Sequence, residues 1–481
     1  MKRKLSRRQF LQSSVTGLGV SSAGLSLSAF SFPRNRAKPN LVFVLADQWR
    51  AQATGYAGDP NAVTPNLDAL AKESVNFTNA VSGCPVCTPY RASLMTGQYW
   101  LTHGLFLNDL TLGNKAVSLA QAYGGAGYDT AYIGKWHLDG HGRSAYIPPE
   151  RRQGFDYWKV LECTHDYNKS AYYAGNDATK RYWDGYDASA QTEDAQKYIE
   201  AHAESGKPFA LFVSWGPPHN PYMTAPQRYR DMFPSEQITL RPNVKGNMAQ
   251  IRQELAGYYA HIAALDDCLG RLLRTLHETG IAENTLFVFT SDHGDMLGSQ
   301  GQQRKQRPWD ESIKVPFLLR YPQLLGTSAK TIDVPINTPD IMPTLLGLCG
   351  IGIPGSVEGS DFSGVIRDGE RHHDEAALIA CFSPFAEYKS NHGKEFRGIR
   401  TRRHTYVRDL QGPWLLYDNE TDPYQTSNLV NKDEYTNVQK ELDTLLTRKL
   451  KQTNDAFLPG QAYIRKWDYK VNESGSVPYK G

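Results

Sequence analysis

The stretch LVFVLADQ, Leu41 to Gln48, passes from an apolar run directly into an acid and an amide. Its short length and its β-branched and aromatic content favour a buried strand at Leu41–Ala46 over a helix. Helical patterns alternate with runs of this kind, which indicates an α/β fold. Three later runs have the same character and are also expected to be strands: Thr130–Ile133 (TAYI), Phe209–Ser214 (FALFVS) and Leu286–Thr290 (LFVFT).

Charged or metal-capable side chains follow each of the four runs. In open α/β sheets, ligands bind at the carboxyl ends of the strands. A single such continuation could be a solvated loop, but the agreement of four predicts a site at this edge of the sheet. The continuations are Asp47-Gln48, Gly134-Lys135-Trp136-His137, Trp215-Gly216-Pro217-Pro218-His219 and Ser291-Asp292-His293-Gly294. The candidate ligands of a divalent metal, mostly through oxygen, are Asp47, Gln48, Asp292 and His293.

A second informative stretch is GCPVCTPYRASLMTG, Gly83 to Gly97. Thr88 suits an N-cap and Gly97 suits the position after a helix, which predicts a helix at Pro89–Thr96. Cys87 would then lie just before the helix N-terminus, where free N–H groups and the helix dipole favour an anion. Arg91 could fold its guanidinium back toward Cys87.

The spacing Cys84-x-x-Cys87 is compatible with two roles for Cys87, as one member of a redox pair or as a ligand in half of a zinc site. The lack of a second CxxC or of a close Cys/His pair disfavours zinc. An anion-binding thiol would also suit a cysteine phosphatase, but those enzymes need C-x5-R, and only three residues separate Cys87 from Arg91. Six cysteines in 481 residues are too few for a disulfide scaffold.

Cys87-Thr88-Pro89-Tyr90-Arg91 resembles the C-x-P-x-R signature of the type I sulfatases, within the alkaline phosphatase superfamily. Tyr90 departs from the family pattern, which has Ser or Ala at this position. The resemblance extends over most of the chain after the first thirty residues. Segments that match in family order are Asn40–Asp47, Thr64–Asp68, Gly134–His137, His219, Asp292–Gly294, Lys305, Tyr417–Asp418, Asp422–Tyr424 and Asn428–Leu429.

The resemblance implies an alkaline phosphatase-like fold, with a large mixed, mostly parallel sheet flanked by helices. We expect this catalytic domain to span residues 38–375. From Ala376 the pattern changes to short strands with polar turns, followed by a helix at Glu434–Leu450. Residues 376–481 are therefore expected to form a smaller C-terminal α+β domain of antiparallel strands and a helix.

The resemblance also implies that Cys87 is a modified residue. In the family this cysteine is oxidised to formylglycine (3-oxoalanine) by a formylglycine-generating or sulfatase-maturating enzyme, which would be a partner of this chain. The family's usual ion is Ca²⁺. Gln48 replaces the second aspartate of the common Asp-Asp pair and His293 offers nitrogen, so Mg²⁺ or Mn²⁺ stays open. The implied metal ligands are Asp47, Gln48, Cys87, Asp292 and His293.

Seven residues would perform the chemistry that the resemblance implies. Hydrated formylglycine at Cys87 would attack the sulfur of a sulfate ester while contacting the metal, and Arg91 would hold it. Lys135 and Lys305 would grip the sulfate oxygens. The implied catalytic residues are Cys87, Arg91, Lys135, His137, His219, Asp292 and Lys305.

The remaining roles concern proton transfer and the pocket wall. By resemblance, His219 would protonate the leaving alcohol and Asp292 would help to deprotonate the nucleophile. His137 would assist the return to the aldehyde. Asn108 and His165 are candidates for the wall of the substrate pocket.

The predicted function is that of an exported sulfatase acting on a sulfated polysaccharide or oligosaccharide. Tyrosines and tryptophans gather between Tyr157 and Tyr186, where they could stack on sugar rings or simply fill the core. One alternative is a phosphonate monoester or phosphodiester hydrolase of the same superfamily, because Asp47-Gln48-Trp49-Arg50 matches the metal segment of those enzymes. A second alternative is a non-catalytic glycan-binding homologue.

The first thirty residues resemble a twin-arginine export signal. Ser6 to Leu11 (SRRQFL) precedes a short apolar stretch that is too serine-rich for a membrane span. We therefore expect transport by the twin-arginine translocase to the periplasm or beyond. The formal net charge is +3, and residues 1–30 hold five positive and no negative side chains, so the rest is near −2. No long-range positive field remains to attract nucleic acid.

Overall fold

The computed structural model describes residues 38–370 and 376–479. From Lys38 onward the chain forms one compact unit. The predicted export signal at residues 1–30 lies outside the described residues. Within them, no helix combines the length and the apolar character that a membrane crossing requires.

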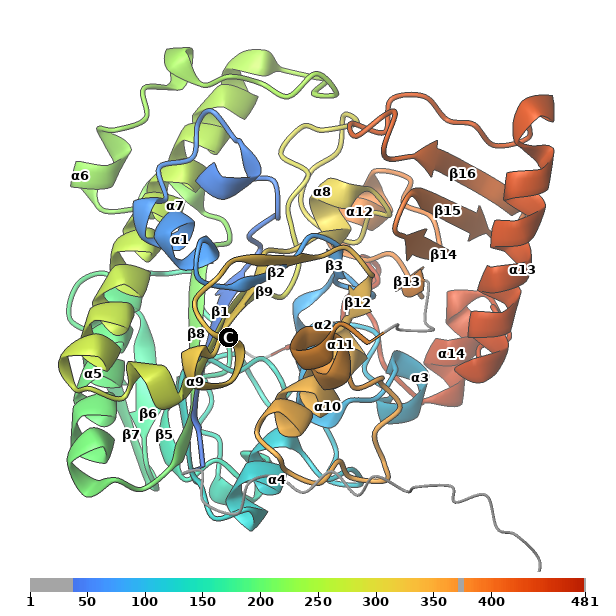
Figure 1. Cartoon of the computed structure of the whole chain (residues 1–481). Coiled ribbons are helices and arrows are strands. Elements are labelled where there is room, and N and C mark those ends of the chain that lie inside the picture. The colour runs from blue at the N-terminus through green and yellow to red at the C-terminus, as the bar shows by residue number, and fades with distance from the viewer. Residues whose placement is uncertain (1–37, 371–375, 480–481) are drawn as a thin grey trace, which may run out of the picture. The chain divides into compact units, whose positions relative to one another are not determined.

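The main element is a ten-stranded sheet with the order β11-β2-β10-β9-β1-β8-β4-β5-β6-β7 (Figure 1). Its inner strands β9, β1, β8, β4 and β5 are parallel, whereas β10 and β6 pair antiparallel with both of their neighbours. This is the mixed, mostly parallel sheet that the resemblance implies. The strands are β1 Asn40–Asp47, β2 Val75–Phe77, β4 Asp129–Lys135, β5 Tyr157–Leu161, β6 Ala171–Ala174, β7 Asp177–Tyr182, β8 Phe209–Pro218, β9 Thr285–Ser291, β10 Phe317–Arg320 and β11 Lys330–Ile332.

Strand β1 is buried on both faces, as expected for a central parallel strand. Leu41, Phe43 and Leu45 belong to one hydrophobic cluster. Val42 and Val44 belong to a second cluster on the opposite face. In Figure 1, helices α1, α5 and α7 cover the second face and α2, α4 and α10 the first. Their bounds are α1 Pro65–Ala71, α2 Cys87–Thr96, α4 Leu119–Gly125, α5 Asp187–Ser205, α7 Met248–Glu278 and α10 Thr338–Leu348.

Shorter elements connect these layers. A two-stranded sheet pairs β3 Ala80–Val81 with β12 Ile336–Asn337. The remaining helices are α3 Trp100–His103, α6 Gln227–Arg230, α8 Asp310–Ile313, α9 Pro322–Leu325, α11 Ser363–Asp368, α12 Ala386–Ser390, α13 Thr436–Gln452 and α14 Gly460–Lys466.

All four strands predicted from the sequence are confirmed, as β1, β4, β8 and β9. They are consecutive parallel neighbours in the sheet, in the order β9-β1-β8-β4. Their carboxyl ends therefore meet at one edge, and the polar continuations converge there.

The C-terminal part contains the predicted antiparallel sheet, β13 Ala376–Cys381, β14 Phe396–Thr401, β15 His404–Asp409 and β16 Gly412–Asp418. The predicted helix at Glu434–Leu450 is α13, which begins at Thr436 and ends at Gln452. Leu378 and Ile399 of this sheet belong to the same hydrophobic cluster as Leu41. Because the two parts share a core, the domain boundary at residue 375 stays a prediction.

Helix α2 differs from its prediction at the N-terminus. It begins at Cys87, with Val86 as N-cap, and Gly97 closes it at φ 65° as expected. Thr88 is not the cap, because its hydroxyl donates to the carbonyl of His137 at 2.9 Å. Asn108 instead accepts the N–H of Thr88 at 3.0 Å. Cys87 is thus the first residue of the helix rather than the residue before it.

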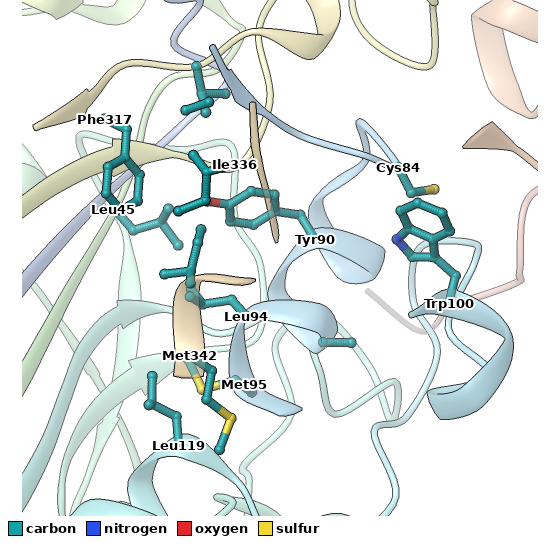
Figure 2. Close-up of a cluster of buried hydrophobic side chains, with 14 of the residues drawn as sticks. Leu45, Cys84, Tyr90, Leu94, Met95, Trp100, Leu119, Phe317, Ile336 and Met342 are labelled. Carbon is teal, nitrogen blue, oxygen red and sulfur yellow. The ribbon is translucent and has the colours of Figure 1, made fainter. Parts of the chain in front are cut away.

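The i, i+4 spacing gives α2 two distinct faces. Figure 2 shows Tyr90 and Leu94 on the core side, near Ile336. Cys87 and Arg91 lie four residues apart on the side of the strand ends. Tyr90 therefore departs from the family signature without entering the site, since its ring packs in the core.

Candidate active site

The first feature of the site is a cluster of metal-capable donors at the ends of β1 and β9. Ala46 pairs with Ser291 in register, which sets Asp47 beside Asp292. Ligand atoms of Asp47, Cys87, Asp292 and His293 all lie within 4.8 Å of one another, and all four residues are buried. All four are among the metal ligands that the resemblance implies.

Gln48 adjoins this cluster, because its backbone N–H donates to Asp292 Oδ1 at 3.0 Å. Its φ is 70°, an uncommon value for a residue with a side chain, which turns the chain sharply after β1. The amide Nε2 donates to Asp295 at 2.6 Å. Its Oε1 is buried without a hydrogen-bond partner among the described residues. A buried oxygen without a partner is costly unless something binds it. Three oxygen-bearing side chains and one imidazole fit a hard divalent cation.

The electrostatics of the two aspartates also fit a cation. Burial would raise the pKa of Asp47, but Lys135, His219 and Lys305 outweigh it and lower that pKa well below its usual value. Burial and the charge of Asp47 raise the pKa of Asp292. Two adjacent carboxylates resist joint ionisation, and a divalent cation between them would remove that resistance.

Three cations surround Cys87 and the aspartates. Lys305 Nζ lies 3.1 Å from Cys87 Sγ. Lys135 Nζ lies 2.5 Å from Asp47 Oδ2 and 3.8 Å from Cys87 Sγ. Arg91 donates to Asp47 at 3.3 Å and to Asp292 at 3.1 Å. The guanidinium of Arg91 therefore fixes the two carboxylates, and its hydrogen bonds do not go to Cys87 as the sequence suggested.

The two cysteines of the CxxC segment have opposite environments. Burial opposes ionisation of Cys87, but Lys135, Lys305 and His293 outweigh it and hold the pKa of its thiol well below the usual value. Burial raises the pKa of Cys84 well above that value. Both are free thiols in this structure. Cys87 is thus the reactive member, and a redox pair is disfavoured.

His219 and Lys305 face each other across the site. His219 Nδ1 donates to the carbonyl of Asn220 at 2.8 Å, since a carbonyl only accepts. Nε2 is then free to accept from Lys305 Nζ at 3.0 Å. The ring of His165 stacks on that of His219, with centroids 4.7 Å apart. Burial and Lys305 hold the pKa of His219 well below its usual value, so the free site presents a neutral imidazole.

His137 has a left-handed backbone conformation, with φ 59°. Its Nε2 lies 3.3 Å from Asp109 Oδ1. Arg143 holds both oxygens of Asp109, at 2.9 and 2.8 Å. Burial opposes the charge of His137, but Cys163 and the hydrogen bond that His137 donates to Asp109 outweigh it and raise the pKa of His137 to about 10.

A cavity of about 520 Å³ opens onto these groups. That volume is within the usual range of small-ligand pockets. Predicted site residues that line it are Gln48, Cys87, Asn108, Lys135, His137, His165, His219 and Lys305.

The comparisons with known proteins agree with this geometry. The sulfatase family model matches residues 39–351, and the C-terminal model of N-sulphoglucosamine sulphohydrolase matches residues 298–452. An ulvan-active sulfatase from Formosa agariphila is 50% identical over 446 residues, covering 92% of this chain and 87% of that protein.

The chain belongs to the sulfatase family. It is a sulfuric ester hydrolase of the type I sulfatases, within the alkaline phosphatase superfamily. A solved sulfatase from Bacteroides fragilis has a TM-score of 0.81 and 30% identity, covering 90% of this chain and 99% of that one. A phosphonate monoester hydrolase from Agrobacterium radiobacter has a TM-score of 0.71 at 24% identity, covering 92% and 100%, and shows the shared fold.

This sulfatase also uses residues that the sequence did not single out. Asp109 and Arg143 support His137, and Ser214 accepts from Arg91 at 2.8 Å. Asp109 could have been found from the sequence, because it directly follows the candidate Asn108. Arg143 had no signal, because it lies in a loop without a motif.

Lys135 reaches the sulfatase site through a close approach of two strands. Gly134 has a φ of 108°, and a Cβ at that position would lie 2.1 Å from the carbonyl oxygen of Ser214. Only glycine fits there. The glycine therefore lets β4 approach β8 and places Lys135 beside Asp47.

Proposed function

We propose that this sulfatase removes sulfate ester groups from a sulfated polysaccharide or its oligosaccharides, after export by the twin-arginine route. We propose that it does so with a formylglycine formed from Cys87 and with bound Ca²⁺. The observation that carries the proposal is the setting of Cys87. Its Sγ lies 3.1 Å from Lys305 Nζ and 3.3 Å from His293 Nε2, within the donor cluster.

Two groups would be added to the chain. A divalent cation held by Asp47, Gln48, Asp292 and His293 would act as a Lewis acid on the substrate. Formylglycine at position 87 would supply a hydrated aldehyde as the nucleophile. The buried, unpartnered Oε1 of Gln48 supports the cation, and the depressed pKa of Cys87 marks it as the reactive thiol.

The side chains around Cys87 are suited to a sulfate group. Lys135 and Lys305 place two ammonium groups within 3.8 and 3.1 Å of Cys87 Sγ. Fixed cations in a buried site stabilise the negative charge that develops on sulfate oxygens. Arg91 keeps both aspartates in place before substrate binds, so little reorganisation is needed.

His219 is placed to serve the leaving oxygen. Its Nδ1 is occupied by a carbonyl, and its Nε2 accepts from Lys305 in the free site. A bound sulfate would draw the ammonium of Lys305 and offset its charge. Both effects free Nε2 and raise the pKa of His219, which favours a proton at the position where the alcohol departs.

His137 adds a positive charge to the wall of the active-site cavity. Asp109 and Arg143 fix its Nε2 edge. Its Nδ1 is buried without a hydrogen-bond partner among the described residues. Because its pKa is raised to about 10, the ring carries a positive charge at neutral pH. We propose that this charge stabilises the sulfate group as it leaves the modified residue 87.

Several observations support a carbohydrate substrate. The Formosa agariphila relative is named for activity on ulvan, a sulfated polysaccharide. The cavity wall is rich in amide and charged side chains, such as Asn108, Gln250 and Gln303, which suit sugar hydroxyls. An export signal would bring the enzyme to polymers that do not enter the cell.

A phosphonate ester is the second candidate, because of Asp47-Gln48-Trp49-Arg50. Two of these four residues turn away from the cavity. Trp49 Nε1 donates to the carbonyl of Ala53 at 2.9 Å, and the Arg50 guanidinium contacts Tyr259 at 3.3 Å. The part of the motif that reaches the site is therefore only Asp47-Gln48, which serves either ester.

The test uses protein expressed with a formylglycine-generating enzyme, with Cys87→Ala as the inactive control. Sulfate release from ulvan and from an aryl sulfate would be compared with cleavage of an aryl phosphonate monoester. We expect kcat/KM for the sulfate esters to be the larger. A preference for the phosphonate ester would overturn the proposal.

A further inference from the structure

A second cavity lies outside the active site. Its volume is about 620 Å³, and it shares no lining residue with the active-site cavity. The wall is formed by residues 51–52, 56–61, 76–78, 239–242 and 314–316 together with Tyr424. The volume suits a ligand of one or two sugar units.

This second cavity is built from chain segments that leave the active site. Ala51 and Gln52 come shortly after Gln48, and the N–H of Ala51 donates to the carbonyl of Lys314 at 3.0 Å. The carbonyl of Tyr424 accepts from Gln300 at 2.9 Å. The loop from Gln300 leads to Lys305. The two cavities therefore lie against the same loops at the carboxyl edge of the sheet.

Two positive side chains, Lys314 and Arg241, and one carboxylate, Asp59, belong to the wall of the second cavity. Lys314 Nζ lies 3.8 Å from Asp310 Oδ2, a long contact. Arg400 already holds both oxygens of that carboxylate, at 3.0 and 3.1 Å. Burial lowers the pKa of Lys314. An anion in the cavity would stabilise this ammonium.

The wall also contains groups that suit the C–H groups and the hydroxyls of a sugar. The Tyr424 side chain is 36% exposed, and the Arg241 guanidinium lies 4.9 Å from its ring centre. An exposed tyrosine ring offers a face to the C–H groups of a sugar. Gln52 and Asn76 add amide side chains to the wall, and amide groups suit sugar hydroxyls.

We propose that this cavity binds an anionic sugar unit of the same polymer, apart from the unit that is desulfated. Positive side chains, an aromatic face and amide groups together match a sugar that carries a sulfate or carboxylate. Attachment at a second point raises the local concentration of sulfate esters at the active site. The inference rests on the proposed polysaccharide substrate.

The first test measures binding without catalysis. Each variant is made in the Cys87→Ala background and run through gels that contain ulvan or neutral dextran. Lys314→Gln and Tyr424→Ala change the cavity, and Lys180→Gln and Tyr182→Ala on the exposed strand β7 are the matched controls. We expect ulvan to retard the controls about fivefold more strongly than the two cavity variants, with no difference in dextran.

The second test measures turnover in the active protein. Both cavity variants should raise KM for ulvan about fivefold and leave kcat/KM for a small aryl sulfate unchanged. Wild-type retardation and wild-type KM in both variants would overturn the inference. If the parent enzyme binds ulvan in the gel but releases no sulfate from it, the proposed substrate is refuted instead. The failure of the inference and the failure of the proposed function therefore give different results.

Discussion

Lys305 allows the electrostatic account of the site to be tested quantitatively. Lys305→Met keeps most of the side-chain length and removes the ammonium, which lies 3.1 Å from Cys87 Sγ and 3.0 Å from His219 Nε2. A unit charge about 4 Å from a developing charge is worth ~4 kcal/mol at an effective dielectric constant of 20. Loss of one fixed donor typically costs about 2.7–4 kcal/mol. Both figures predict a fall in kcat of about 10²- to 10³-fold.

The same substitution should not destabilise the protein. Lys305 forms no ion pair with a carboxylate among the described residues, and its ammonium contacts Cys87, His219 and His293. Burial opposes the charge of Lys305, but Cys87 and Asp47 outweigh it in the thiol form and raise its pKa. Formylglycine replaces the Cys87 thiol, the largest of these favourable contributions, so the ammonium then bears more of the cost of burial. We therefore expect the Tm of Lys305→Met to equal or exceed that of the parent.

The assay combines desulfation kinetics with thermal unfolding of protein that carries formylglycine. Lys330→Met, on the exposed edge strand β11, is the matched control and should change neither kcat nor Tm. Added sulfate should raise the Tm of the parent and of the control, but not that of Lys305→Met. A kcat within tenfold of the parent, or a fall in Tm that parallels the fall in kcat, would refute the reasoning.

Three further predictions concern the metal, the second histidine and acid stability. Gln48→Leu removes the unpartnered Oε1 and should weaken Ca²⁺ binding, measured as the Ca²⁺ concentration that raises Tm halfway; an unchanged midpoint would exclude Gln48 as a ligand. Asp109→Asn removes the carboxylate that holds His137 and should lower kcat about 10- to 100-fold with little change in KM. An equal loss through KM would show a binding role instead. Burial lowers the pKa of His261 to about 3, below its unfolded value, so the unfolded chain binds more protons and stability falls as pH falls from about 6.5 toward 3. Urea unfolding at pH 7 and pH 5 should show a smaller loss for His261→Gln than for the parent, by about 2 kcal/mol; equal losses would assign the acid sensitivity to other groups.

Much of the site followed from local sequence, because parallel strands place their carboxyl ends at one edge. Asp47, Lys135, His219 and Asp292 are each within a few residues of a strand end that could be recognised from its apolar run. Once the strands are neighbours, these side chains must meet. The fold and the core of the site were therefore accessible without coordinates.

Other features depended on long-range contacts. The sequence predicts Thr88 as the N-cap of α2, but the N-cap is Val86. The hydroxyl of Thr88 donates to the carbonyl of His137, and Asn108 accepts the N–H of Thr88. The hydrogen bonds of Arg91 to Asp47 and Asp292 also link residues far apart in the sequence. No local pattern reports such partners, since they depend on how the elements pack.

The most direct test of the central claim is the mass of the tryptic peptide Glu73–Arg91, taken from protein isolated from its native host. That peptide contains both Cys84 and Cys87, and fragment ions assign a change to one of them. The account predicts that Cys87 has lost sulfur and two hydrogens and gained one oxygen, while Cys84 remains a thiol. An active enzyme in which Cys87 remains a thiol would contradict it.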